Sequence, residues 1–173
     1  MDLRIVQNTQ IILDYAQECD AAAVALARAV EIRATPLHAS RFHKSLNFHE
    51  MIKECAESVG AEISVAQYFG IKGFKPTINT FKNEADVMAR LEVKWTKYSD
   101  TGHLIIHKTD REDDVAMLVT GTSPVYRLVG WIPIKMARNE LFYNETQNNY
   151  WIPQGKLYAP EILRSRVNGH SQG

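Results

Sequence analysis

The chain has 173 residues, with 20 basic and 20 acidic side chains and 45% apolar residues. A chain of this length can bury about 70% of the surface that it exposes when unfolded, so we expect one domain with its own core. The balanced charge excludes a strongly basic nucleic-acid coat protein and an acidic tail. It does not exclude a nuclease, whose basic residues need only be gathered on one face.

Two features bear on the compartment. The two cysteines, Cys19 and Cys55, are too few for a disulfide scaffold or a zinc cage, and we expect both to be buried free thiols in a reducing cytosol. The N-terminal residues lack the pattern of a secretory signal, and no apolar run approaches the roughly 18 residues of a membrane span. We therefore expect a cytoplasmic protein with no membrane partner.

The first half of the chain predicts two helices. An Ala-rich segment without Gly or Pro predicts a long helix over residues 11–32, which Thr35-Pro36 ends because a residue before proline avoids the helical conformation. A second helix is expected over residues 47–69, with Gly70 and Gly73 as its C-terminal signal.

The second half predicts mainly strands. The connections between β-rich runs are short enough for hairpins, so at least part of the sheet should be antiparallel. A short helix near residues 135–140 and a packed extended tail are expected to follow. This order of elements is typical of an α/β or α+β layer structure. The β-rich runs are residues 77–81, 91–98, 103–107, 115–121 and 125–134.

The residues with the clearest chemical meaning begin at Asp86. Glu92 and Lys94 are two residues apart, so on a strand both side chains point to the same face. In a straight strand Asp86 would lie about 20 Å from Glu92. A tight turn at residues 88–90 would instead bring Asp86 opposite Glu92, with Cβ atoms about 5 Å apart. The Met-Ala-Arg sequence of that turn lacks the residues that favour turns.

Such a pair of carboxylates favours a bound cation, and oxygen ligands beside a lysine suit Mg²⁺. Glu62 adds a third carboxylate within a stretch of small and apolar residues on the second helix. The alternative interpretation is an exposed ladder of ion pairs on an edge strand, with Glu62 a solvated helix residue.

Three further groups carry weaker signals. His38, His43 and His49 lack regular zinc-ligand spacing, and the acidic run 110–114 is interpreted as a solvated turn. Aromatic residues with basic neighbours would suit stacking on unpaired bases, although packing in the core is the commoner role of such side chains. These aromatic residues are Trp95, Trp131, Tyr143, Tyr150, Trp151 and Tyr158.

The order G-A-E-x-x-V-A-x-x-x-G at 60–70, then Asp86, then E-V-K at 92–94 resembles the PD-(D/E)XK nuclease superfamily. The runs at 103–121 and 125–134 are similar to the strands after the lysine in small phage-encoded members. The resemblance covers residues 47–137. It implies an α/β fold with a restriction-endonuclease-like core, in which helices flank a mixed central sheet, plus an extra N-terminal helix.

The resemblance also implies roles for particular residues. Asp86 and Glu92 match the metal-binding carboxylates, and the Val93 carbonyl would complete that ligand set. Lys94 matches the catalytic lysine. Glu62 matches the helix glutamate, which would hold a second metal or position the lysine. The implied cofactor is Mg²⁺, with Mn²⁺ as a substitute.

Two departures from the family pattern are visible. Ala85 stands where proline is usual, and the spacing between the aspartate and Glu92 is short, which leaves Glu84 as an alternative to Asp86. The implied organisation is a single nuclease-like domain over 1–173. It comprises an N-terminal helical extension (1–46), a core (47–137) and an aromatic C-terminal extension (138–173).

The function that follows from the resemblance is Mg²⁺-dependent hydrolysis of phosphodiester bonds in DNA, of endonuclease, resolvase or exonuclease type. A phage-encoded protein would act in the host cytoplasm. Two alternatives stay open. One is a catalytically silent nuclease-fold protein that binds DNA or a host protein, and the other is a homo-oligomeric interaction protein that associates through its Ala-rich helix.

Overall fold

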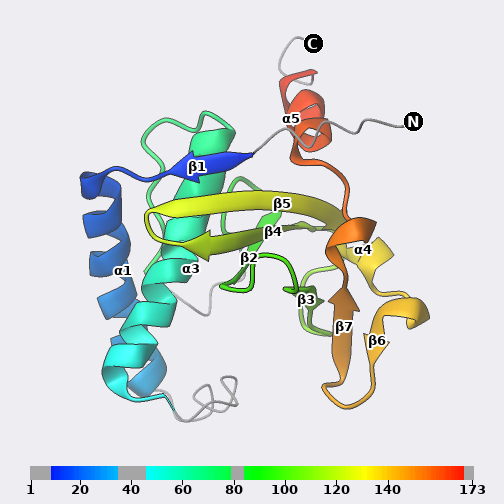
Figure 1. Cartoon of the computed structure of the whole chain (residues 1–173), viewed down its shortest axis with the longest axis horizontal. Coiled ribbons are helices and arrows are strands. Elements are labelled where there is room, and N and C mark those ends of the chain that lie inside the picture. The colour runs from blue at the N-terminus through cyan, green and yellow to red at the C-terminus, as the bar shows by residue number, and fades with distance from the viewer. Residues whose placement is uncertain (1–8, 35–45, 79–83, 170–173) are drawn as a thin grey trace.

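The computed structural model describes residues 9–34, 46–78 and 84–169, and Figure 1 shows its elements in chain order. The helices are α1 (Tyr15–Ala34), α3 (Phe48–Tyr68), α4 (Ile134–Ala137) and α5 (Pro160–Gly169), with 3₁₀ turns η1 (Glu140–Phe142) and η2 (Gln154–Lys156). The strands are β1 (Gln10–Ile12), β2 (Leu91–Thr96), β3 (Leu104–Ile106), β4 (Val115–Thr122), β5 (Val125–Pro133), β6 (Tyr143–Asn144) and β7 (Asn149–Ile152).

The main sheet has four strands in the order β1-β5-β4-β2. β2 runs parallel to β4, whereas the β4–β5 and β5–β1 pairs are antiparallel. A second sheet, in the order β3-β7-β6, is antiparallel throughout. The expected α/β class, with a mixed sheet and flanking helices, is therefore confirmed. The connection from β2 to β4 passes through β3 and turns, with no helix in residues 97–114.

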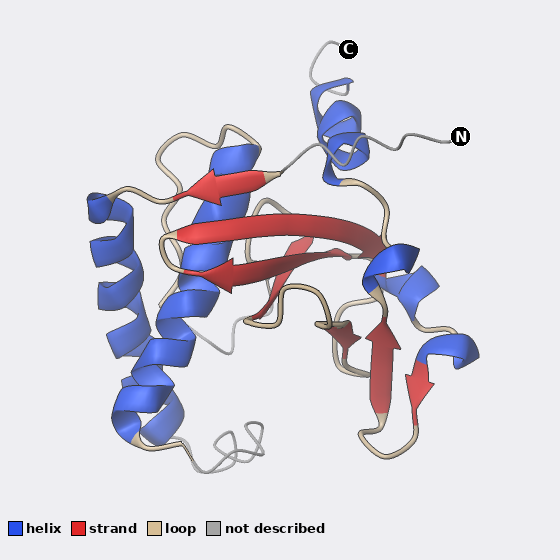
Figure 2. Ribbon diagram, in the orientation of Figure 1, coloured by secondary structure: helices blue, strands red, loops and turns tan. Residues whose placement is uncertain are grey.

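β4, inside the main sheet, is buried on both faces. Figure 2 shows helices α1 and α3 together on one side of the sheet and the small second sheet on the other. Met117 and Val119 of β4 pack in the cluster that includes α3, whereas Ala116 and Leu118 pack with β3, β7 and α4. Burial on both faces explains why β4 is an almost continuous apolar run instead of an alternating one.

The helix expected at 47–69 is confirmed to within one residue at each end. Asn47 Oδ1 accepts a hydrogen bond from the Glu50 amide at 3.0 Å, and Glu50 Oε2 accepts one from the Asn47 amide at 2.9 Å. This reciprocal capping box satisfies two amide groups that the first turn leaves without helical partners. Beyond the helix, Gly70 adopts a positive φ of 71°, which glycine tolerates without steric cost.

The helix expected at 11–32 begins later than predicted. Residues 10–12 form β1, which pairs with β5, so Ile11 and Ile12 belong to the sheet. α1 starts only at Tyr15. The Gln17 amide donates to Asp14 Oδ1 at 2.8 Å, and the Asp14 amide donates to Gln17 Oε1 at 2.9 Å, so the two residues cap the start of the helix. The strand forms through a partner more than a hundred residues away, which the local Ala-rich pattern does not reveal.

The C-terminal segment also differs from its prediction. The expected packed extended tail is extended only at β7, which is followed by η2 and by helix α5. Pro160 occupies the first position of α5, where its missing N–H costs nothing and its fixed φ favours the helix. The short helix expected near residues 135–140 corresponds to α4 and η1.

Other expectations have mixed outcomes. Cys55 is buried as expected, but Cys19 is exposed on α1. In the run expected as a strand at 77–81, residues 77 and 78 are not in a strand, and residues 79–81 lie outside the described residues. His38 and His43 also lie outside them. Within the described part of the chain, no helix combines the length and the apolar character needed to cross a membrane.

Candidate active site

A tight turn at Met88-Ala89-Arg90 brings Val87 back against Leu91. The Val87 amide donates to the Leu91 carbonyl at 3.0 Å, and the Leu91 amide donates to the Val87 carbonyl at 3.2 Å. Met88 adopts a positive φ of 55°, which is uncommon for a residue with a side chain. Of the two conformations that the sequence left open, the structure has the tight turn at residues 88–90 and not a straight strand over residues 86–94.

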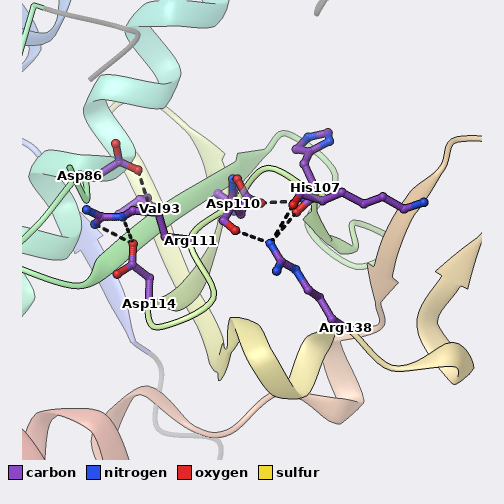
Figure 3. Close-up of polar contacts among 9 residues, drawn as sticks. Asp86, Val93, His107, Asp110, Arg111, Asp114 and Arg138 are labelled. Atoms are coloured by element: carbon purple, nitrogen blue, oxygen red, sulfur yellow. Dashed lines mark hydrogen bonds and ion pairs between the residues drawn. The ribbon is translucent and has the colours of Figure 1, made fainter. Parts of the chain in front are cut away.

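Asp86 is fixed at the start of this turn by the strand that follows. Its Oδ2 atom accepts a hydrogen bond of 2.9 Å from the Val93 amide, as Figure 3 shows. The alternative carboxylate, Glu84, is exposed. Of the two acidic residues before the turn, Asp86 is therefore the one with a described contact to β2.

Glu92 and Lys94 share the face of β2 opposite Leu91 and Val93, which are buried. Glu92 is held in an environment that disfavours its charge: burial raises its pKa most, and the nearby Asp86 carboxylate raises it further. Lys94 acts in the opposite direction, but the balance raises the pKa of Glu92 to about 8. The expected closeness of Asp86 and Glu92 is consistent with this electrostatic coupling.

Lys94 has a carboxylate partner that the sequence did not suggest. Its Nζ lies 3.0 Å from Asp110 Oδ1, and Asp110 Oδ2 accepts a hydrogen bond from the His107 amide at 2.8 Å. Figure 3 shows Arg138 reaching the same loop, where its guanidinium donates to the carbonyls of His107 and Asp110. The loop between β3 and β4 is thus tied down at several points and carries Asp110 to the lysine.

The acidic run 110–114 is therefore not simply a solvated turn. Asp110 is half-buried in the ion pair with Lys94. Asp114 is only 3% exposed and accepts a hydrogen bond of 2.7 Å from Arg111 Nε. Glu112 and Asp113 between them are exposed, as a solvated turn would require.

Glu62 is buried on α3, with 2% exposure, so it is not a solvated helix residue. Arg28 of α1 binds it with both terminal nitrogens, at 2.7 Å to Oε1 and 3.0 Å to Oε2. The Arg28 Nε donates to the Thr77 carbonyl at 2.8 Å. Burial opposes the charge of Arg28, but the contacts with Glu62 and the nearby Asp86 carboxylate raise its pKa above the ordinary value.

Sequence reasoning missed Arg28 and Asp110. Arg28 had a usable signal, because Ala21, Ala25, Ala29 and Ile32 are the buried positions of α1 and residue 28 falls on the same helical face. A charged residue on the buried face of a helix requires a partner. Asp110 had no comparable signal, because a turn residue gives no periodicity from which to judge its direction.

The site has an excess of negative charge. The four carboxyl groups of Asp86, Glu92, Glu62 and Asp110 are linked electrostatically with two cations, Arg28 and Lys94. When all six are ionised, two negative charges remain uncompensated, and the raised pKa of Glu92 is one consequence. Carboxylate oxygens such as those of Asp86 and Glu92 are of the ligand type that Mg²⁺ accepts in proteins. No group of three or more His, Cys, Asp or Glu residues arranged to hold a metal is present among the described residues.

Comparisons of the chain with protein-family models, with curated proteins and with solved structures found no significant match.

Proposed function

We propose that the protein is a Mg²⁺-dependent nuclease that hydrolyses phosphodiester bonds in DNA, with a restriction-endonuclease-like core. One observation carries the proposal: the turn at residues 88–90 holds Asp86 against β2 beside Glu92, and Lys94 follows on the same strand face. The Asp86 carboxylate disfavours ionisation of Glu92, and a lysine lies next to the pair. Two such carboxyl groups and a lysine are suited to metal-assisted hydrolysis of a phosphodiester.

In this proposal Asp86 and Glu92, together with the Val93 carbonyl, hold the cation. The bound ion would polarise the scissile phosphate and lower the pKa of a water molecule. Lys94 would donate hydrogen bonds to the phosphate oxygens as negative charge develops on them. The ion pair with Asp110, at 3.0 Å, would hold the Lys94 ammonium in a defined position for this role.

Glu62 and Arg28 have a supporting role in the proposal. The two groups neutralise each other beneath the turn, and Arg28 places positive charge near Asp86. The carry-over of Glu62 as a ligand of a second metal has less support, because both of its carboxylate oxygens accept hydrogen bonds from Arg28.

A catalytically silent protein that binds DNA or a host protein is the second candidate. The observation that favours it is the same ion pair between Lys94 and Asp110. If Lys94 interacted more favourably with Asp110 than with a substrate phosphate, it would remain in the ion pair and have only a structural role. Binding without cleavage would then be the whole activity.

The test is a cleavage assay on a supercoiled plasmid, a branched junction and a single strand, each with Mg²⁺ or Mn²⁺. Lys94→Ala should reduce cleavage by roughly a hundred- to a thousandfold, the usual cost of removing one group that stabilises developing charge. Lys94→Arg should also fail, because the bulkier guanidinium does not reproduce the position of the ammonium.

Lys135→Ala is the matched control, because Lys135 is 78% exposed and lies on α4. It should cleave like the wild type. Equal cleavage by wild type and Lys94→Ala would contradict the assignment of the lysine. DNA binding without cleavage by the wild type on any of the three substrates would favour the silent binding protein.

A further inference from the structure

A groove of about 630 Å³ begins at Lys94 and extends between β2 and the second sheet. Its volume lies within the range of about 300–1,000 Å³ that is usual for ligand sites. Lys94 and Thr96 line it from β2. Because Lys94 belongs to both the groove and the candidate active site, a ligand that reached Lys94 in the groove would lie next to the groups proposed to act on the phosphate.

The second sheet turns one of its faces into this groove. Along β3, Leu104 and Ile106 are buried in the core, so Ile105 and the flanking His103 and His107 lie on the other face and line the groove. Along β7, Tyr150 and Ile152 pack in the core. The alternate residues Asn149 and Trp151 line the groove.

The lining suits an unpaired nucleobase. The rings of His103 and Trp151 lie with centroids 5.6 Å apart, and Trp151 Nε1 donates to Asn149 Oδ1 at 2.7 Å, which fixes the orientation of the indole. Although the chain has as many acidic as basic residues, none of the described residues that line the groove is acidic. A polyanion would therefore meet aromatic rings and a lysine there, without repulsion from a lining carboxylate.

We propose that the groove binds single-stranded nucleic acid by stacking an unpaired base on Trp151, next to the phosphate that faces Lys94. This inference rests on the proposed nuclease function and names its substrate class. A base inside a duplex has both faces covered by its neighbours and cannot stack on a protein ring, whereas an unpaired base can. The preferred substrates would then be single strands, flaps or branched DNA with unpaired nucleotides.

The experiment measures binding without turnover. A fluorescein-labelled oligothymidylate of about 12 nucleotides is titrated with the protein in EDTA, and anisotropy reports the Kd. Two comparison probes have the same length: an abasic strand, which keeps the phosphates but lacks bases, and a duplex. The variants are Trp151→Ala, Trp151→Phe and Tyr15→Ala. The last removes an aromatic ring that is 82% exposed at the start of α1 and does not line the groove.

We expect Trp151→Ala to weaken oligothymidylate binding by about tenfold, and Trp151→Phe and Tyr15→Ala to leave it within about twofold. The abasic strand should bind the wild type about as weakly as oligothymidylate binds Trp151→Ala. Circular dichroism of each variant would exclude misfolding. Equal affinity for the abasic and normal strands, or an affinity for the duplex that matches the single strand, would overturn the groove assignment.

The groove and the nuclease proposal can fail separately. Base-dependent binding without cleavage in Mg²⁺ would contradict the nuclease but leave the groove as a single-strand binding site. Cleavage that proceeds equally on duplex and single strand, unaffected by Trp151→Ala, would support the nuclease and contradict the groove.

Discussion

Arg28 and Glu62 form a bidentate ion pair between α1 and α3, with side chains only 9% and 3% exposed. Removing one partner leaves a buried charge uncompensated, which typically costs about 3–5 kcal/mol. We therefore expect Arg28→Met to reduce the free energy of unfolding by that amount, measured by urea denaturation. The double variant Arg28→Met/Glu62→Leu should recover at least half of the loss, because no charge then remains unpaired.

Arg33→Met is the control for this cycle. Arg33 is exposed at the end of α1, where its guanidinium lies over the Phe48 ring, and its loss should cost no more than about 1 kcal/mol. A double variant as unstable as Arg28→Met would show that the arginine stabilises the fold through packing and not through its charge.

The raised pKa of Glu92 should make the free energy of unfolding fall as the pH rises. Its pKa in the folded protein is raised from 4.5 to about 8, so the folded state binds a proton more tightly than the unfolded state does. The contribution of Glu92 to stability is then complete below about pH 4.5 and is lost as the pH rises to about 8.

The measurement is urea unfolding at pH 5 and pH 9 in EDTA, for the wild type and Glu92→Gln. Glutamine cannot ionise, so the variant should lose less stability than the wild type between the two pH values. Parallel losses in both proteins would mean that Glu92 is not the group that takes up the proton.

A divalent cation should stabilise the protein through Asp86 and Glu92. At a concentration about a hundredfold above Kd, a ligand that binds only the folded state raises the melting temperature of a chain this size by about 5–10 °C. Asp86→Asn should remove that shift with Mg²⁺ and with Mn²⁺. Glu84→Gln, which changes the exposed neighbouring carboxylate, should keep it. An undiminished shift in Asp86→Asn would place any cation elsewhere.

Gly60 is required by the close approach of β5 to α3. A Cβ atom at this position would lie 2.2 Å from the hydroxyl of Tyr126, whose Oη donates to Glu57 at 2.7 Å. Alanine is otherwise favoured over glycine in a helix by about 1 kcal/mol. We nevertheless expect Gly60→Ala to destabilise the fold by about 1–3 kcal/mol, the usual cost of overpacking a core. Gly155→Ala, where nothing lies within 4 Å, should be neutral in the same thermal melt.

The end of α3 was predicted from a local signal, the glycine at position 70 that follows the helix. The reciprocal caps of Asn47 and Glu50 at its start are equally local, but sequence reasoning did not use them. By contrast, β1 depends on its pairing with β5, and its three residues, Gln-Ile-Ile, are too few to show a strand pattern of their own. A pattern confined to neighbouring residues cannot reveal a strand whose partner is distant.

In the candidate site, too, some features follow from neighbouring residues and others depend on residues far away in the sequence. The turn at Met88 was recognised only because it would bring Asp86 to Glu92, since its own residues disfavour it. The two Val87–Leu91 hydrogen bonds and the Asp86–Val93 contact evidently outweigh the roughly 1–2 kcal/mol cost of the left-handed conformation at Met88. The Lys94–Asp110 pair joins residues on β2 and on a distant loop, so it follows from the tertiary fold and not from spacing.

Asp110 is expected to act as a positioning residue for Lys94. Its two oxygens have separate partners, since Oδ1 binds the lysine and Oδ2 accepts from the His107 amide. In Asp110→Asn the amide oxygen can still accept a hydrogen bond from the His107 amide, so the loop should keep its conformation, while the charge that positions Lys94 is lost.

Misplacing a catalytic group by about 1 Å can cost up to about a hundredfold in rate. We therefore expect kcat on the best DNA substrate to fall by about ten- to a hundredfold, with KM nearly unchanged. The free energy of unfolding should fall by about 1–3 kcal/mol, because the side chains of Lys94 and Asp110 are only 23% and 14% exposed and the lysine loses its charged partner. Glu112→Gln, which alters an exposed carboxylate of the same loop, is the matched control and should retain full activity. An Asp110→Asn variant with wild-type kcat would mean that the ion pair serves the loop and not the lysine.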